Sequence, residues 1–238
     1  MKKNWLLIIF AILYLVLLGS LFFLSSRTGQ KSLISPLGSS FFNQPKPLEK
    51  YSFENLRKRQ YQGSEIKLEK VLQEQNSYTS YLFSFESDGK KVTGMANLPK
   101  KEGKLPVVVM IRGYADDQVY FTGLGTRKGA GVFAENGFIT LAPDFLGFGG
   151  SDTSSLDILE ARFERPITVL NLLASIENLP QANPDKIFLW AHSNGGQITL
   201  SVLEISQKPI PTVLWAPVTK GFPESVLQYM GEMDDQGL

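Results

Sequence analysis

The residues with the clearest chemical potential are those from Ala191 to Gly195, which read AHSNG. A serine hydroxyl is a weak nucleophile unless a base removes its proton and hydrogen-bond donors stabilise the oxyanion that develops. Ser193 has small residues two positions before it and two positions after it, which is the pattern of a nucleophile elbow, a sharp strand-to-helix turn that exposes the serine oxygen. His192 is adjacent to Ser193, and a side chain at that position of such a turn is expected to point away from the hydroxyl, so we expect this histidine to pack beside the turn and help to orient it rather than to act as the base.

A second stretch, Arg112-Gly113-Tyr114, follows the apolar run at 106–111 and could complete such a site. An oxyanion is stabilised by backbone N–H groups that are already in position. We predict that these donors are the N–H of Tyr114, on the loop formed by Arg112 and Gly113, and the N–H of Asn194 at the positive end of its helix. Taken alone, Gly113 is more typical of a plain tight turn, and its pairing with the elbow is what favours the oxyanion loop.

The elements that must position these residues alternate between strands and helices after residue 104. Before that point, two β-rich runs within 81–99 flank Asp88-Gly89, a dipeptide typical of a tight hairpin turn. The later expected strands are 106–111, 138–143, 186–191 and 211–217, and the expected helices are 126–137, 159–176 and 194–206. Pro166 is expected to kink or split the second helix. This order predicts an α/β fold with a mostly parallel sheet and helices on both faces.

From Tyr81 to Pro217 the chain resembles the α/β-hydrolases, within them the branch that includes prolyl oligopeptidase and dienelactone hydrolase. The resemblance rests on RGY, APDFLGFGGSD and AHSNGG, each of which follows an expected strand. The middle stretch matches the family pattern at positions that we interpret as shaping the loop rather than as catalytic: Pro143, Asp144, Gly147, Gly149, Ser151 and Asp152. The sequence departs from the family at Ala191, where glycine is usual, and at Arg112, where many relatives have histidine.

The resemblance implies a triad in which an acid and then a histidine follow the nucleophile along the chain. The residues after Ser193 contain no histidine, and Asp234 and Asp235 are acids without an imidazole to orient. Either the chain is the front part of a longer gene product or it has lost catalysis. We expect the first, with a hydrolase domain that is incomplete at its C-terminus, because the strand at 211–217 would otherwise leave an open, aggregation-prone sheet edge.

The N-terminus contains an uncharged run at 5–24, about the ~20 residues that a helix needs to cross a bilayer. We predict a single-pass anchor at 1–26 with the catalytic part outside the cytoplasm; a cleaved signal peptide is the alternative. The remaining domain prediction is a flexible tether at 27–50, an accessory extension at 51–77 and the partial α/β-hydrolase domain at 78–238.

The composition excludes several other kinds of protein. A formal net charge of +1 gives no reason to expect nucleic-acid binding, and the absence of cysteine excludes disulfides and thiolate metal sites. The glycines of 123–129 miss the spacing of a dinucleotide-binding loop.

From the elbow, the resemblance and the apolar N-terminal run together, we predict a membrane-anchored serine hydrolase, a prolyl oligopeptidase-like peptidase that acts through an acyl-serine without a metal or organic cofactor. The alternatives are a carboxylesterase of the same fold and an inactive hydrolase-like binding protein.

Overall fold

The computed structural model describes residues 47–221 and residue 224. The chain divides into two units, 1–47 and 48–238, and all the described helices and strands belong to the second. The predicted anchor at 1–26 and most of the predicted tether lie outside the described residues. Within the described part of the chain, no helix has both the length and the hydropathy that a membrane span requires.

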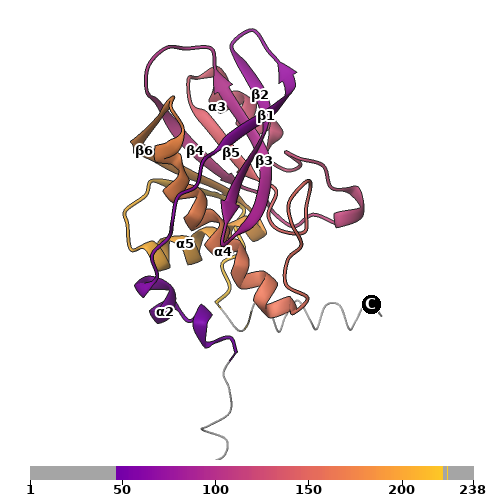
Figure 1. Ribbon diagram of the computed structural model, residues 1–238, viewed down its shortest axis with the longest axis vertical. Coiled ribbons are helices and arrows are strands. Elements are labelled where there is room, and N and C mark those ends of the chain that lie inside the picture. Colours follow the sequence, from indigo (N-terminus) through magenta and orange to yellow (C-terminus); the bar gives the residue numbers. More distant parts are fainter. Residues whose placement is uncertain (1–46, 222–223, 225–238) are drawn as a thin grey trace, which may run out of the picture. The chain divides into compact units, whose positions relative to one another are not determined.

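The core of the second unit is one seven-stranded sheet with the strand order β1-β2-β3-β5-β4-β6-β7 (Figure 1). Its strands are β1 (Lys67–Glu74), β2 (Tyr78–Ser87), β3 (Lys90–Pro99), β4 (Leu105–Ile111), β5 (Ile139–Pro143), β6 (Ala182–His192) and β7 (Thr212–Trp215). The four strands expected after residue 104 are all present, and the turn at Asp88-Gly89 joins β2 to β3 as predicted.

The sheet is mixed, whereas the sequence predicted a mostly parallel one. Strands β5, β4, β6 and β7 run parallel, but β1, β2 and β3 are antiparallel to their neighbours, and β3 pairs directly with β5. The reason is that the tight β2–β3 hairpin joins the same sheet instead of standing apart, and a turn that short can connect only antiparallel strands.

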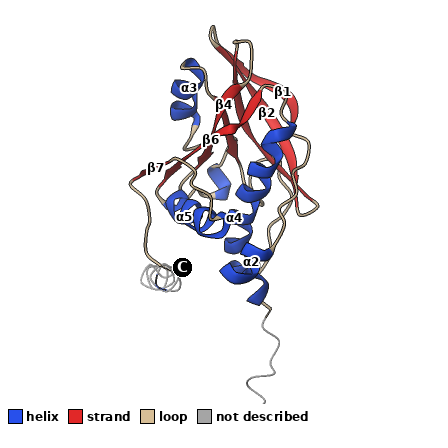
Figure 2. Ribbon diagram, turned by 90° about the vertical axis from the view of Figure 1, so that its left-hand side faces the viewer, coloured by secondary structure: helices blue, strands red, loops and turns tan. Residues whose placement is uncertain are grey.

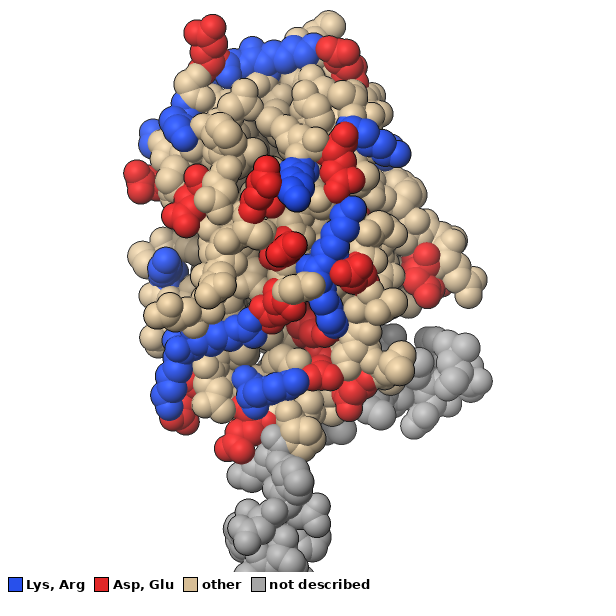
Figure 3. Space-filling view, viewed as in Figure 1, with Lys and Arg blue, Asp and Glu red and all other residues tan. Residues whose placement is uncertain are grey.

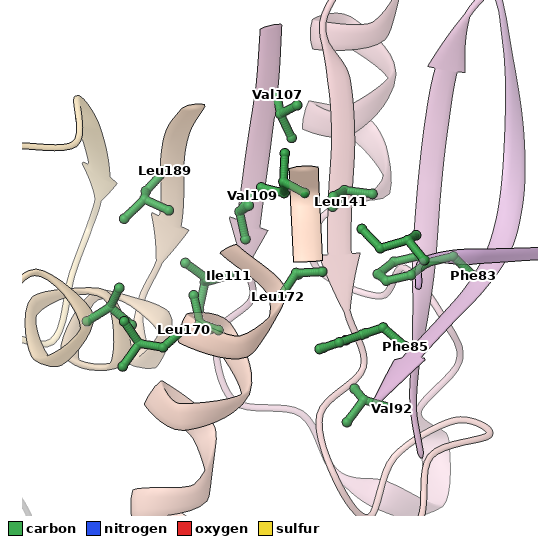
Figure 4. Packing of buried hydrophobic residues seen from close by; sticks show 14 of the residues in the cluster. Phe83, Phe85, Val92, Val107, Val109, Ile111, Leu141, Leu170, Leu172 and Leu189 are labelled. Carbon is green, nitrogen blue, oxygen red and sulfur yellow. The ribbon is translucent and has the colours of Figure 1, made fainter. Parts of the chain in front are cut away.

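Helices cover both faces of the sheet, as predicted. Helix α3 (Arg127–Glu135) lies on one face, and α4 (Ile158–Ser175) and α5 (Asn194–Ser206) lie on the other (Figure 2). Alternate residues of the buried strands point to opposite sides. Val109 and Ile111 of β4 therefore face Leu170 and Leu172 of α4 (Figure 4), while Met110 belongs to the smaller cluster beside α3.

Helix α4 runs through Pro166 without interruption, so this proline does not split the helix, which was one of the two expected outcomes. Pro166 and the residue after it are buried, and the apolar side of α4 from Ile167 to Leu172 packs against the sheet and α5. A proline inside a helix removes one backbone hydrogen bond. The burial of this long apolar side offsets that loss.

The segment from 48 to 77 contains the 3-10 helix η2 (Glu49–Tyr51), α2 (Phe53–Lys58) and the edge strand β1. Ion pairs connect its first part to the helical layer: Lys50 lies 2.6 Å from Glu160 of α4, and Arg57 pairs with Glu204 of α5. Positive and negative side chains are interspersed across the face shown in Figure 3. Exposed pairs of this kind contribute little to stability, because water and salt screen them.

Candidate active site

Ser193 lies at a strained turn between a buried strand and a helix. Strand β6 ends at His192, α5 begins at Asn194, and Ser193 between them has φ 52° and ψ −122°. A positive φ in a residue with a side chain costs on the order of 1–3 kcal/mol and persists only where surrounding contacts enforce it. The nucleophile elbow of α/β-hydrolases is a strained strand-to-helix turn of this kind, with the serine oxygen exposed above the sheet.

Hydrogen bonds from the neighbouring strand maintain the turn. The backbone N–H of Ser193 donates to the carbonyl oxygen of Trp215 in β7 at 3.2 Å. The carbonyl oxygen of Ser193 accepts from the N–H groups of Gly196 and Val218, both at 2.9 Å. Strand β7 and the loop that follows it thus stabilise the backbone of the elbow through two hydrogen bonds to Ser193.

Two glycines allow the loops on either side of Ser193 to approach closely. A Cβ atom at Gly195 would lie 2.3 Å from the carbonyl oxygen of Ile111 and 2.6 Å from that of Arg112, so the first turn of α5 sits directly against the end of β4. A Cβ atom at Gly113 would lie 3.0 Å from the Cβ of Ser193. Ala191 is fully buried in β6, where it pairs with Ile111.

The structure therefore brings together the two loops that the sequence singled out, although they are far apart along the chain. Tyr114, which follows Gly113, is 68% exposed at the surface beside the elbow. Asn194 belongs to the first turn of α5, where N–H groups have no carbonyl partner within the helix. Tyr114 and Asn194 are thus the residues that directly follow the two that lie against each other, Gly113 and Ser193.

His192 packs against aromatic side chains. Its ring centroid lies 5.4 Å from that of Trp215 and 6.4 Å from that of Trp190, with which it is stacked. These contacts place the His192 ring beside Trp190 of β6 and Trp215 of β7. Trp190 belongs to the apolar cluster on the face of the sheet that α3 covers.

The loop after β5 is organised around a buried carboxylate. Asp144 is fully buried and accepts hydrogen bonds from the hydroxyl groups of Thr93 and Tyr120, both at 2.6 Å, and of Thr122 at 2.9 Å. Burial, together with this carboxylate, raises the pKa of Tyr120 well above its usual value, so the phenol remains a donor. The roles of Thr93, Tyr120 and Thr122 could not be predicted from the sequence, because isolated hydroxyl residues carry no spacing signal.

The remaining residues of the predicted loop-shaping set also make structural contacts. Gly149 has φ +61°, and a Cβ atom there would lie 2.3 Å from a carboxylate oxygen of Asp144. The side chains of Ser151 and Asp152 accept hydrogen bonds from the backbone N–H groups of Thr93 and Lys91, at 2.9 and 2.7 Å. The loop is thereby attached along β3.

We predict that Asp144→Ala lowers the free energy of unfolding by about 3 kcal/mol, because three hydroxyl groups lose a charged acceptor in a buried place. Urea denaturation measures this change. Asp157→Ala, which removes the exposed carboxylate that caps α4, is a matched control with an expected loss of about 1 kcal/mol. Equal losses in the two variants would contradict the organising role of Asp144.

A cavity of about 250 Å³ lies away from the elbow, between the segment around Tyr51, the β2–β3 turn and α4. The cations around it are each paired with a carboxylate: Lys50 with Glu160, Arg59 with Asp88, and Lys90 with Glu164. Because its charges are already matched, we assign this cavity no part in the chemistry of Ser193.

Comparison with known proteins identifies the fold. No family model and no curated protein matches the chain. Similar solved structures include acetyl xylan esterase 1 from a Thermoanaerobacterium species, with 17% identity and a TM-score of 0.56, over 80% of this chain and 68% of that one. An acetyl xylan esterase from a Paenibacillus species gives 20% identity and a TM-score of 0.56, over 74% of this chain and 60% of that one. An α/β-hydrolase from a Penicillium species gives 21% and 0.50, over 66% and 54%.

These similarities establish the α/β-hydrolase fold, as the motifs predicted. The chain spans 60% and 54% of the length of the second and third structures. At these identities the comparison speaks for the fold, and the function must be argued from the site.

Proposed function

We propose that this chain carries the nucleophile of a serine hydrolase that cleaves carboxylic esters. The observation that carries the proposal is the strained backbone of Ser193, with φ 52°, at the junction of β6 and α5. In this reaction the Ser193 oxygen attacks the ester carbonyl, the bond from the carbonyl carbon to the leaving alcohol breaks, and water then hydrolyses the acyl-serine. A base must take the serine proton in the first step and return a proton to the alcohol.

The N–H groups of Tyr114 and Asn194 would stabilise the oxyanion. Gly113 lies against Ser193, so the peptide that follows it is within reach of an oxygen on the attacked carbon. Asn194 opens α5, and its N–H is at the positive end of the helix dipole. The loss of one such donor typically slows turnover about 10²–10³-fold.

The base and the acid are proposed to come from sequence that follows residue 238 in a longer gene product. The sequence contains one histidine, and its ring is stacked with Trp190 beside the elbow. In α/β-hydrolases the acid and the histidine follow the nucleophile along the chain. An in-frame continuation that encodes an aspartate or glutamate and then a histidine would support this, and a stop codon in the natural gene would contradict it.

We propose an esterase in preference to the prolyl oligopeptidase-like peptidase that the motifs suggested. Two solved structures that share the fold are acetyl xylan esterases. The test compares p-nitrophenyl acetate with a prolyl p-nitroanilide on the complete gene product. Strong ester turnover without amide turnover would support the esterase proposal. Efficient amide turnover would support the peptidase proposal instead.

The inactive binding protein is the competing class, and a fluorophosphonate probe separates it from the enzyme. The probe forms a bond between phosphorus and the oxygen of an activated serine, with loss of fluoride, so mass spectrometry of the labelled peptide identifies Ser193 directly. A complete gene product that the probe never labels would overturn the hydrolase proposal.

We further propose that residues 5–24 anchor the protein in a bilayer with the hydrolase domain outside the cytoplasm. The uncharged run in that part of the sequence supports this. Carbonate extraction of membranes at high pH should leave the protein in the pellet, and release into the supernatant would contradict the anchor.

A further inference from the structure

Arg112 is a buried cation at the end of β4. The residue is 5% exposed, and burial lowers the pKa of its guanidinium. The guanidinium carbon lies 4.2 Å from the ring centroid of Phe148, 4.6 Å from that of Tyr120 and 5.6 Å from that of Phe145. Cation–π contacts stabilise the charge most when, as here, it is removed from water.

The hydrogen bonds of Arg112 bridge two loops. Nη1 donates to the carbonyl oxygen of Gly113 at 2.9 Å, and Nη2 donates to the carbonyl oxygen of Asp144 at 3.1 Å. Among the described residues, Nε has no hydrogen-bond partner. Apolar side chains would fill such a site without the desolvation cost of a charge, so stability alone is a weak reason for an arginine here.

The bond to Gly113 fixes the direction of the next N–H group. The carbonyl of Gly113 and the N–H of Tyr114 belong to the same planar trans peptide, in which they point in opposite directions. Since Arg112 holds the carbonyl, it also fixes the N–H, which lies in the same plane and points away from the guanidinium. Gly113 itself lies against Ser193, where a Cβ atom would be 3.0 Å from the serine Cβ.

We infer that Arg112 is the positioning residue of the oxyanion hole: by holding the Gly113 carbonyl it aims the Tyr114 N–H at the oxygen of the acyl group on Ser193. The inference rests on the proposed hydrolase function and identifies what orients one of its donors. Without the guanidinium the peptide can rotate, and a misplacement of about 1 Å in an active site typically costs about 100-fold in rate. Lysine presents one compact ammonium and cannot hold both carbonyls in the fork geometry of arginine.

The experiment compares Arg112→Met and Arg112→Lys with Arg57→Met in the complete gene product. Arg57 is a matched control, because it also donates to a main-chain carbonyl, that of Glu204, and also lies over an aromatic ring, that of Phe53, but it is on α2. For p-nitrophenyl acetate we expect kcat to fall about 100-fold in Arg112→Met and about 10-fold in Arg112→Lys with KM nearly unchanged, because the lost interaction acts on the transition state. Arg57→Met should keep wild-type kinetics.

A second measurement reports the peptide directly. On protein labelled with ¹⁵N-tyrosine, the residual dipolar coupling of the Tyr114 amide depends on the direction and order of its N–H bond. We expect this coupling to shrink towards zero in Arg112→Met, while the couplings of Tyr78 and Tyr81 in β2 stay at their wild-type values and show that the sheet is intact. Arg112→Lys keeps the charge and most of the aliphatic part of the side chain. If Arg112→Met does not fold, the kinetics and the Tyr114 coupling of Arg112→Lys test the inference in its place.

Either an unchanged Tyr114 coupling or turnover within about threefold of wild type in the folded Arg112 variants would overturn the inference, since a lost oxyanion donor costs at least about 10²-fold. A wild-type protein without ester turnover would instead refute the proposed function. In that case the dipolar coupling still decides whether Arg112 fixes the peptide.

Discussion

Ester turnover by the complete gene product is expected to fall about 10⁵-fold in Ser193→Ala, to the level that binding and the oxyanion donors support alone. The reason is that alanine has no oxygen to attack the carbonyl, so an acyl-enzyme cannot form. Fluorophosphonate labelling should disappear at the same time. Initial rates with p-nitrophenyl acetate and intact-protein mass spectrometry measure both effects.

Ser201→Ala is the matched control for this prediction. Ser201 lies on the same helix, α5, and its hydroxyl donates to the carbonyl oxygen of Gln197 at 3.1 Å. This variant should retain wild-type rate and labelling. If Ser193→Ala kept a tenth or more of the wild-type rate in a folded protein, Ser193 would not be the nucleophile, whatever the strain at its backbone.

Gly195→Ala is expected to destabilise the fold by about 3 kcal/mol and to slow turnover about 100-fold. The added methyl group would meet the carbonyl oxygens of Ile111 and Arg112 at 2.3 and 2.6 Å. Both contacts are with backbone, so no side chain can turn aside, and α5 must move away from β4. That movement carries Asn194 away from the Gly113 loop, so stability and activity fall together.

Gly129→Ala provides the comparison for this second prediction. Gly129 lies in the first turn of α3, where an added Cβ would meet the flexible end of Met110 at 3.2 Å. A glycine-to-alanine change inside a helix usually stabilises it by about 0.5–1 kcal/mol, so this variant should be neutral or slightly stabilised. Urea denaturation of both variants measures the difference, and a Gly195→Ala protein as stable as wild type would contradict the close packing of α5 on β4.

Asp144 and Arg112 show how the elbow is supported from outside its own motif. The carboxylate of Asp144 accepts hydrogen bonds from three hydroxyl groups. Its main-chain carbonyl oxygen accepts a hydrogen bond from the guanidinium of Arg112. Arg112 in turn holds the carbonyl of Gly113. The loop after β5 is thus connected, through one buried arginine, to the backbone beside Ser193.

The sequence by itself determined the features that depend on local interactions. The alternation of apolar runs with helical periodicity predicted β4 to β7 and the helices between them, because burial on one or both faces imposes those periods. Asp88-Gly89 predicted the hairpin, and the small residues around Ser193 predicted a turn from strand to helix. Each of these signals lies within a few residues of the structure that it specifies.

Only the tertiary structure decided the features that depend on residues distant in the sequence. Strand β1 carries charges and is exposed along its whole length, so it has no alternating apolar pattern, and its membership of the sheet is decided by pairing with β2. The contact of Gly113 with Ser193 requires β4 to lie beside β6, and the bridge from Arg112 to Asp144 requires β4 to lie beside β5. Such contacts form because the apolar faces of the sheet and the helices are buried together. The free energy of this burial depends on the whole domain, so no single stretch of sequence predicts which strands become neighbours.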